Sequence, residues 1–266
     1  MGVEPPIVGP SAKETDVTNP FKAHGIEHLS PSSCNRYAAA PAMFVLEKVL
    51  KNSSSVGAGA HRGTAVEAGV AAGLDDLSAS ADHCIEVAMQ KFAELTALSG
   101  DHRVDKERES IPGFVATALS ELRPYGKPTA TQGKVSIEVP GLAVPIIGFF
   151  DFEWEESGVI VDLKTTHQCP SKISAAHARQ VSLYRRVRGH EDPRISYVTS
   201  KRAATYRLEN ADEHFSALVN IAFTIQRFLS LSDNPQFLAS LVSPDPDSFY
   251  YSDPITRDKS FKQWGI

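Results

Sequence analysis

"GFFDFEWEESGVIVDLKTT", residues 148–166, places charged side chains inside two stretches that are otherwise rich in apolar, strand-forming residues. Asp151 lies in the first stretch, and Asp162 and Lys164 lie in the second. Burying a charge costs free energy unless the charge is paired or bound to a metal. We therefore expect these three side chains to have a chemical role.

The two stretches predict a β-hairpin whose connection is "EESG", residues 155–158. With Trp154 opposite Val159, counting back along both strands puts Asp151 directly opposite Asp162. Since side chains alternate between the faces of a strand, the two carboxylates then share one face. The same alternation predicts Phe150, Phe152 and Trp154 together on the other face.

Opposed carboxylates need a compensating cation, because directly facing Cβ atoms are only about 4.5–5.5 Å apart. Mg²⁺ favours oxygen ligands and typically takes one or two protein carboxylates. Lys164 lies on the same face, where it would orient a water or stabilise charge on a phosphate. The alternative is an exposed polar face with an ordinary surface ion pair. The hairpin alone leaves both open.

The rest of the chain predicts one α/β domain, residues 28–243, with no internal repeat. A flexible lead-in is expected at residues 1–27 and a tail packed on the domain at residues 244–266, anchored by Phe261 and Trp264. Pro41 is expected to split the helix that begins near Ser30. Further helices are expected over residues 63–73, 83–99, 109–123, 171–188 and 212–231, and further strands over residues 131–139 and within 194–208.

Composition excludes several classes of protein. A formal net charge of −5 over 266 residues means that any nucleic-acid contact must come from a local basic patch. Three cysteines lie far apart without a CxxC pair, which argues against a disulfide framework, a zinc ribbon or an iron–sulfur cluster. Without a signal-peptide pattern or an apolar run of about 18 residues, we expect a cytoplasmic protein that is neither secreted nor membrane-embedded.

The hairpin motif and a motif upstream of it resemble those of one nuclease family. The pattern Gly148-x-x-Asp151 followed by Asp162-x-Lys164 resembles the active-site core of the PD-(D/E)XK nuclease superfamily. "RGTAVE", residues 62–67, is similar to the R-G-x-x-x-E motif of its lambda-exonuclease and RecB-like branches, as found in phage-type exonucleases.

Two more motifs complete the order found in that family. Gln180-x-x-x-Tyr184 is similar to the Q-x-x-x-Y helix motif of RecB-type nucleases, and "LSPSSCNRYAAAP", residues 29–41, resembles their L-S-x-S opening. Unlike the iron–sulfur nucleases, the chain has alanine at position 40 and no cysteine cluster in its C-terminal part. The resemblance therefore implies no iron–sulfur cluster.

The resemblance implies a restriction-endonuclease-like core with a mixed central β-sheet flanked by α-helices, and Mg²⁺- or Mn²⁺-dependent hydrolysis of DNA. By this resemblance, Glu67, Asp151 and Asp162 are the metal ligands, and the Leu163 carbonyl is an extra ligand. Lys164 is expected to position the attacking water. The alternative for Glu67 is an exposed helix glutamate.

The resemblance also implies a set of DNA contacts. Gln180 and Tyr184 are one turn apart on a helix and share a face, so the amide is expected near the metal or a phosphate and the ring against a base or sugar. Helix packing is the alternative for both. The expected DNA-contacting residues are Ser32, Arg62, Arg179, Gln180 and Tyr184. His61 stays open between a metal ligand, a phosphate contact and a surface role.

The predicted function is a metal-dependent DNA exonuclease in DNA recombination, repair or end processing, in a bacterial or phage-infected cell. The alternatives are a structure-specific endonuclease of the same fold and a non-catalytic DNA-binding protein that retains it. The chain has no GxxxxGK[ST] motor motif. We therefore expect it to act on ends or gaps, or with a single-strand annealing protein or helicase as its partner.

Overall fold

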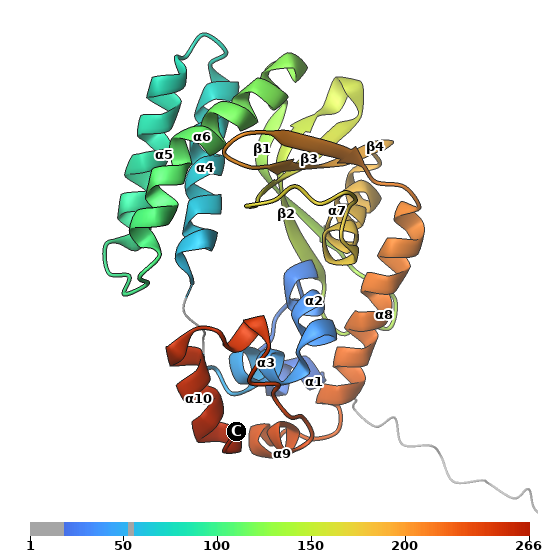
Figure 1. Cartoon of the computed structure of the whole chain (residues 1–266). Helices are drawn as coiled ribbons and strands as arrows, with labels where there is room; N and C mark the ends of the chain where they lie inside the picture. Colours follow the sequence, from blue (N-terminus) through green and yellow to red (C-terminus); the bar gives the residue numbers. More distant parts are fainter. Residues whose placement is uncertain (1–18, 53–55) are drawn as a thin grey trace, which may run out of the picture.

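A mixed five-stranded sheet forms the centre of the molecule in the computed structural model, which describes residues 19–52 and 56–266 (Figure 1). The strand order is β1-β2-β3-β4-β5, with β3 and β4 parallel and the other neighbours antiparallel. The strands are β1 (Ala130–Ile137), β2 (Ile146–Trp154), β3 (Val159–Thr165), β4 (Asp192–Val198) and β5 (Ala203–Arg207). Helices flank this sheet, which confirms the predicted α/β class.

Of the α-helices in the described residues, six precede the strands, one lies between β3 and β4, and three follow β5. They are α1 (Pro20–Ala23), α2 (Pro31–Ala39), α3 (Pro41–Phe44) with a π-helical turn (Val45–Val49), α4 (Ala58–Asp75), α5 (Ala81–Thr96), α6 (Val104–Leu122), α7 (Ala175–Arg188), α8 (Ala211–Leu229), α9 (Pro235–Ser240) and α10 (Pro254–Trp264). As expected, Pro41 ends one helix and begins the next. Within the described ranges, no helix is long and apolar enough to cross a membrane.

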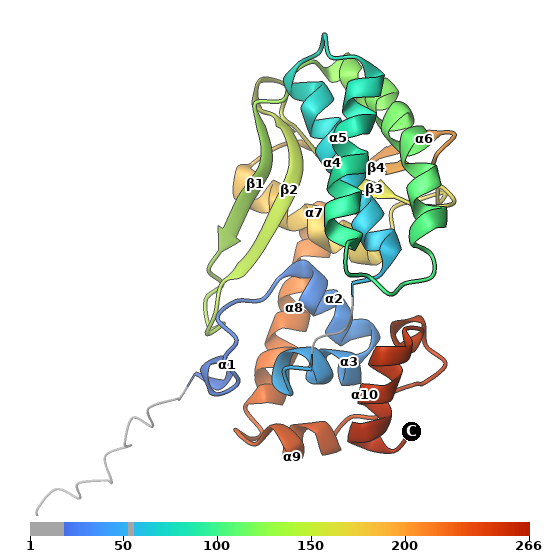
Figure 2. The same ribbon diagram turned by 90° about the vertical axis from the view of Figure 1, so that its left-hand side faces the viewer.

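Helices α4, α5 and α6 form a bundle beside one part of the sheet (Figure 2). Small residues let α4 and α5 approach closely, because a Cβ atom at Gly69 would lie 2.5 Å from the backbone oxygen of Cys84. The bundle shares a core with Phe152, Val161 and Leu163 of the sheet. This packing brings α4 against β3 and fixes its position relative to the hairpin.

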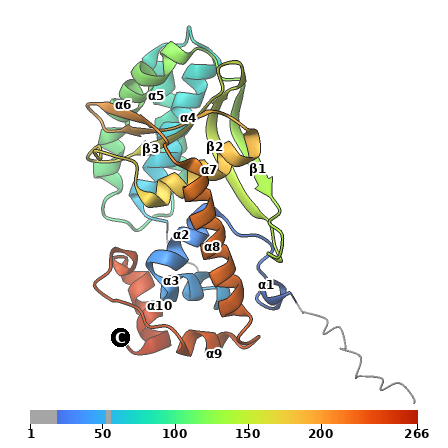
Figure 3. The same ribbon diagram turned by 90° about the vertical axis from the view of Figure 1, so that its right-hand side faces the viewer.

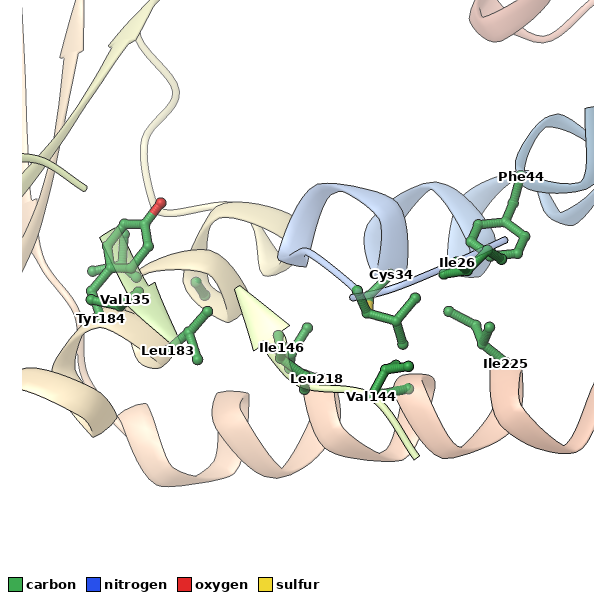
Figure 4. Packing of buried hydrophobic residues seen from close by; sticks show 14 of the residues in the cluster. Ile26, Cys34, Phe44, Val135, Val144, Ile146, Leu183, Tyr184, Leu218 and Ile225 are labelled. Carbon is green, nitrogen blue, oxygen red and sulfur yellow. The ribbon is translucent and has the colours of Figure 1, made fainter. Parts of the chain in front are cut away.

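A second core lies between the sheet and helices α2, α7 and α8 (Figure 4). Ile146, Tyr184 and Leu218 are among its buried members. Helix α7 connects the parallel strands β3 and β4, and it ends at Gly189 with a φ of 74°, as the sequence predicts. Helix α8 packs along α7 and α2, and it leads away from the sheet to α9 (Figure 3).

The two ends of the chain differ in part from expectation. Of the predicted lead-in, residues 1–18 lie outside the described residues, whereas residues 20–23 form α1 and Phe21 is fully buried. At the other end, Trp264 packs on the fold and donates a hydrogen bond of 2.9 Å to the Ala239 carbonyl. Phe261 is 60% exposed, so its predicted anchoring role is wrong, and the buried Tyr251 serves instead.

The hairpin has the predicted register from its connection to the pair Phe152 and Val161, and the predicted pair of Asp151 and Asp162 lies just beyond the ladder. Trp154 pairs with Val159 and Phe152 pairs with Val161, and Gly158 closes the connection with a φ of 64°. The predicted alternation is wrong at one place: Phe152 packs with the α4–α6 bundle, but Phe150 packs with the α7 core.

The interruption of this alternation lies between those two phenylalanines. There Gln132 of the neighbouring strand β1 has a left-handed φ of 53°, which disturbs the pleat beside Asp151. Phe150 and Phe152 therefore point to opposite sides of the sheet, and Asp151 lies between them.

Candidate active site

Asp151 lies where strands β2 and β3 separate. The ladder between the strands ends at the pair Phe152 and Val161, and Asp151 and Asp162 are the next positions in the same register. Instead of a backbone carbonyl, Asp151 Oδ2 accepts the hydrogen bond of the Leu163 amide, at 2.6 Å. The carboxylate is therefore held between the two strands and is almost fully buried.

Asp162 lies on the central strand β3 and is also buried. Lys164, two residues further on the same strand, places its Nζ 2.6 Å from Asp162 Oδ2. Glu67 comes from the middle of α4 and interacts with Asp151. Among the described residues, Glu67 Oε1 is a buried oxygen without a hydrogen-bond partner. Three elements thus bring together three carboxylates and one ammonium group.

Helix α7 supplies a polar support for Asp162 from the other side of the sheet. Gln180 Nε2 donates hydrogen bonds to Asp162 Oδ1 at 3.0 Å and to Tyr184 Oη at 2.6 Å. The Tyr184 hydroxyl in turn donates to the Phe149 carbonyl at 2.5 Å. One oxygen of Asp162 is thereby held by α7, while the other faces Lys164.

Burial and mutual repulsion disfavour the charged carboxylates. Burial raises the pKa of Asp151 well above its usual value, and the neighbouring Asp162 and Glu67 raise it further. Burial also raises the pKa of Glu67. For Lys164, burial lowers the pKa, but Asp162 and Asp151 outweigh it and raise the pKa above its usual value. One lysine thus only partly neutralises the cluster.

The donor set fits a hard divalent cation. Within residues 19–52 and 56–266, no group of three or more His, Cys, Asp or Glu side chains forms a ready-made metal cage. Asp162 Oδ2 faces Lys164, and Asp151 Oδ2 faces the Leu163 amide. However, Mg²⁺ needs only one or two protein carboxylates beside water and phosphate oxygens. Buried, mutually repelling carboxylates are groups that such an ion would stabilise.

The comparison with protein families agrees with this geometry. The family model described as the PD-(D/E)XK nuclease superfamily matches residues 28–246. This chain belongs to the PD-(D/E)XK nuclease superfamily. A search of curated proteins gives no match. A solved structure titled "Crystal structure of SSO0001" is 15% identical, with 62% of this chain and 85% of that chain covered and a TM-score of 0.35, a likeness too low to support an argument.

In this PD-(D/E)XK chain, the predicted DNA contact at Arg62 is not accessible. The guanidinium is buried, forms an ion pair with Glu107 of α6 and stacks over the Phe114 ring at 4.5 Å. Arg62 Nη2 also reaches Thr165 Oγ1 at 3.3 Å, directly after Lys164. The prediction is corrected: Arg62 joins α4, α6 and the end of β3 in the interior.

Tyr184 is corrected for the same reason. Its side chain is 1% exposed and packs edge-on against the Phe150 ring, so it cannot stack on a base or sugar. Gln180, in contrast, lies next to the acidic cluster, which agrees with the first of its two expected positions. Both residues of the Q-x-x-x-Y motif therefore contact Asp162 in the interior of the PD-(D/E)XK core, and Tyr184 is not exposed on its surface.

The remaining predicted contacts lie on α2, α7 and α4. Ser32 is exposed in the first turn of α2. Arg179 Nε of α7 donates a hydrogen bond of 2.6 Å to Asn35 Oδ1 of α2. Arg179 thus joins α7 to α2, whereas Ser32 is an exposed residue of α2. His61 is half-buried on α4, and its role stays a prediction, as does the Leu163 carbonyl as a ligand.

Two polar residues beside the site belong to none of the sequence motifs. Gln132 Nε2 lies 3.5 Å from Asp151 Oδ1, which only the strand register of β1 reveals. His177 is half-buried near Asp162 and Lys164, and its Nδ1 lies 2.7 Å from Tyr197 Oη. Its position three residues before Gln180 on one helix face is a signal that the sequence does contain.

Proposed function

We propose that this protein is a divalent-cation-dependent DNA nuclease that acts as an exonuclease in recombination, repair or end processing. The observation that carries the proposal is the convergence of Glu67, Asp151, Asp162 and Lys164 from α4, β2 and β3. When bound, Mg²⁺ or Mn²⁺ would polarise the phosphate and promote deprotonation of water. Glu67, Asp151 and Asp162 are the residues that would hold it.

The protein's own groups divide the work of phosphodiester hydrolysis. Lys164 is the single cation next to the buried carboxylates of the described site, and its ammonium group donates to the attacking water or a phosphate oxygen. Water adds to phosphorus, its proton leaves, and the bond from phosphorus to the leaving sugar oxygen breaks. Gln180 and Tyr184 keep Asp162 oriented, and Ser32 and Arg179 contact the DNA backbone.

The proposal of an exonuclease is supported by the substrate that the chain can use by itself. Opening a duplex needs a motor, and the sequence carries no P-loop motif. The protein therefore works from ends or gaps, or with a partner such as a helicase or a single-strand annealing protein. An endonuclease of the same fold differs in one respect, since it cuts DNA that has no end.

The test uses end-labelled linear DNA and closed-circular single-stranded DNA, with Mg²⁺, with Mn²⁺ or with a chelator. The wild type should degrade only linear DNA and only with the cation, and Asp162→Asn and Lys164→Met should be inactive. Asp258→Asn and Lys262→Met, which alter an exposed ion pair on α10, are matched controls and should retain activity. Cleavage in chelator, or cleavage that survives both site variants, would refute the proposal. Cleavage of circles would make it an endonuclease.

A further inference from the structure

The β1–β2 hairpin has a covered face and an open face beyond Asp151. Gly148 and Phe150 point to the covered side: a Cβ atom at Gly148 would lie 2.9 Å from Tyr184 Cε1, and the Phe150 ring centroid lies 6.3 Å from that of Tyr184. Phe149, between them, must point to the opposite side. Its side chain is 53% exposed, although it is a large apolar group in the middle of a strand.

The open face combines this aromatic ring with a positive charge. Lys134 of β1 is the direct cross-strand partner of Phe149, so their side chains share a face, and Lys134 is exposed. In the next pair on this face, Ser136 is polar and exposed, and Ile147 is apolar and half-buried. Strands β1 and β2 run past α4 and α5 toward α1 (Figure 2), so this end of the face is not packed against the helical bundle.

The open face ends beside Asp151, where the pleat of β2 changes. Phe149 precedes Asp151 by two residues on one strand, a rise of about 6.6 Å. That distance is close to two base steps of about 3.4 Å along a DNA strand. Gln132 continues the same path, since its Nε2 lies 3.5 Å from Asp151 Oδ1. A DNA strand whose phosphate lay at the carboxylates would therefore bring a base within reach of Phe149.

We propose that Phe149 and Lys134 form a base-stacking subsite for an unpaired end of the DNA substrate. This inference rests on the proposed function and deepens it, because it names the form of DNA that the site prefers. An aromatic ring stacks on any base, but only on one whose face is free, and bases inside a duplex are covered by their neighbours. Lys134 binds a neighbouring phosphate. The subsite selects single-stranded or frayed ends over blunt duplex ends.

The test measures binding of phosphorothioate oligonucleotides, which resist cleavage, so that the result does not depend on activity. Phe149→Ala should weaken single-strand binding by about 5- to 150-fold, the loss expected for one stacked base, and should change blunt-duplex binding by less than about twofold. Phe261→Ala removes a similarly exposed ring on α10 and should change neither affinity. In cleavage of single strands, Phe149→Ala should raise KM and leave kcat unchanged.

A second variant reports stacking directly and guards against misfolding. Phe149→Trp should keep wild-type affinity, and its fluorescence should be quenched by single strands but not by blunt duplex. Equal effects of Phe149→Ala on both DNA forms, no effect on either, or an unquenched tryptophan would overturn the stacking subsite. The proposed function itself would fail in a different measurement, if the wild-type protein did not cleave DNA in the presence of a divalent cation. The two outcomes are therefore distinguishable.

Discussion

Gln180 Nε2 donates a hydrogen bond of 3.0 Å to Asp162 Oδ1, while Oδ2 of the same carboxylate faces Lys164 Nζ at 2.6 Å. The two oxygens of Asp162 thus have different partners on opposite sides. A carboxylate held in this way cannot rotate without breaking one of these contacts. The amide of Gln180 is therefore a positioning group for the central acidic residue of the site.

Gln180→Met keeps the length of the side chain but removes the donor. We expect the activity, or the affinity for the activating cation, to fall by about 10- to 100-fold, as is typical when a group that orients a metal ligand is lost. The measurement is kcat as a function of Mg²⁺ concentration. Gln90→Met, on the exposed side of α5, is the matched control. Wild-type kinetics in Gln180→Met would show that Asp162 needs no support from α7.

Asp151→Asn should stabilise the protein when no divalent cation is present. Asparagine removes a charge that is buried beside Asp162 and Glu67, and its oxygen can still accept the Leu163 amide. Relief of about 1 kcal/mol would raise Tm by about 2–4 °C for a chain of this size. Thermal unfolding in chelator measures this change, with Asp258→Asn as the exposed control.

Adding Mg²⁺ should then raise the Tm of the wild type but not that of Asp151→Asn, because ligand binding stabilises only a protein that retains the site. A lower Tm for Asp151→Asn in chelator would contradict the inferred repulsion. Equal stabilisation of both proteins by Mg²⁺ would place the ion elsewhere.

Arg62→Met should destabilise the fold by about 3–5 kcal/mol, because it leaves Glu107 buried without its cation. Glu107→Met should have a similar effect, since Arg62 is then the unpaired charge. The double variant should recover much of the loss, because two apolar side chains can replace a buried ion pair. Chemical denaturation measures all three. If Arg62→Met were stable but bound DNA poorly, the residue would be a DNA contact after all.

The ionisation of Glu153 should make the free energy of unfolding depend on pH. Burial raises its pKa, but Arg188, with bonds of 2.6 and 2.9 Å, and His190 outweigh this and hold the pKa below its usual value. A lowered folded-state pKa contributes stability above the ordinary carboxyl value, and this contribution is lost as pH falls through the folded value. Glu153→Gln should therefore cost up to about 3 kcal/mol at pH 7 and much less at about pH 3–4. Denaturant titrations at both pH values test this, and a pH-independent loss would contradict it.

Local rules were sufficient for the hairpin. The apolar pattern and the connection at residues 155–158 determine the register, and the structure has that register. The same rules failed one residue further, because the pleat changes at Asp151. That change depends on the Leu163 amide and on the left-handed backbone of Gln132, both of which are tertiary relationships. No periodicity within β2 reveals them.

Motif spacing identified the positions near the site but not which of them are buried. Arg62 and Tyr184 were expected on the DNA surface, whereas both are interior because Glu107 and Phe150 pack against them. A motif records which residues lie near a site, but burial depends on helices that pack from elsewhere in the chain. For the same reason Phe149 attracts no notice in the sequence, where it is one of several adjacent aromatics.

The origin of the acidic cluster on separate elements also matters during synthesis of the chain. Glu67 on α4 leaves the ribosome long before Asp162, and Gln180 follows last. Because a chain is made from its N-terminus, no nascent product shorter than about Gln180 contains the complete cluster and its support. Chains that end before Gln180 therefore cannot assemble the acidic cluster together with its support from α7.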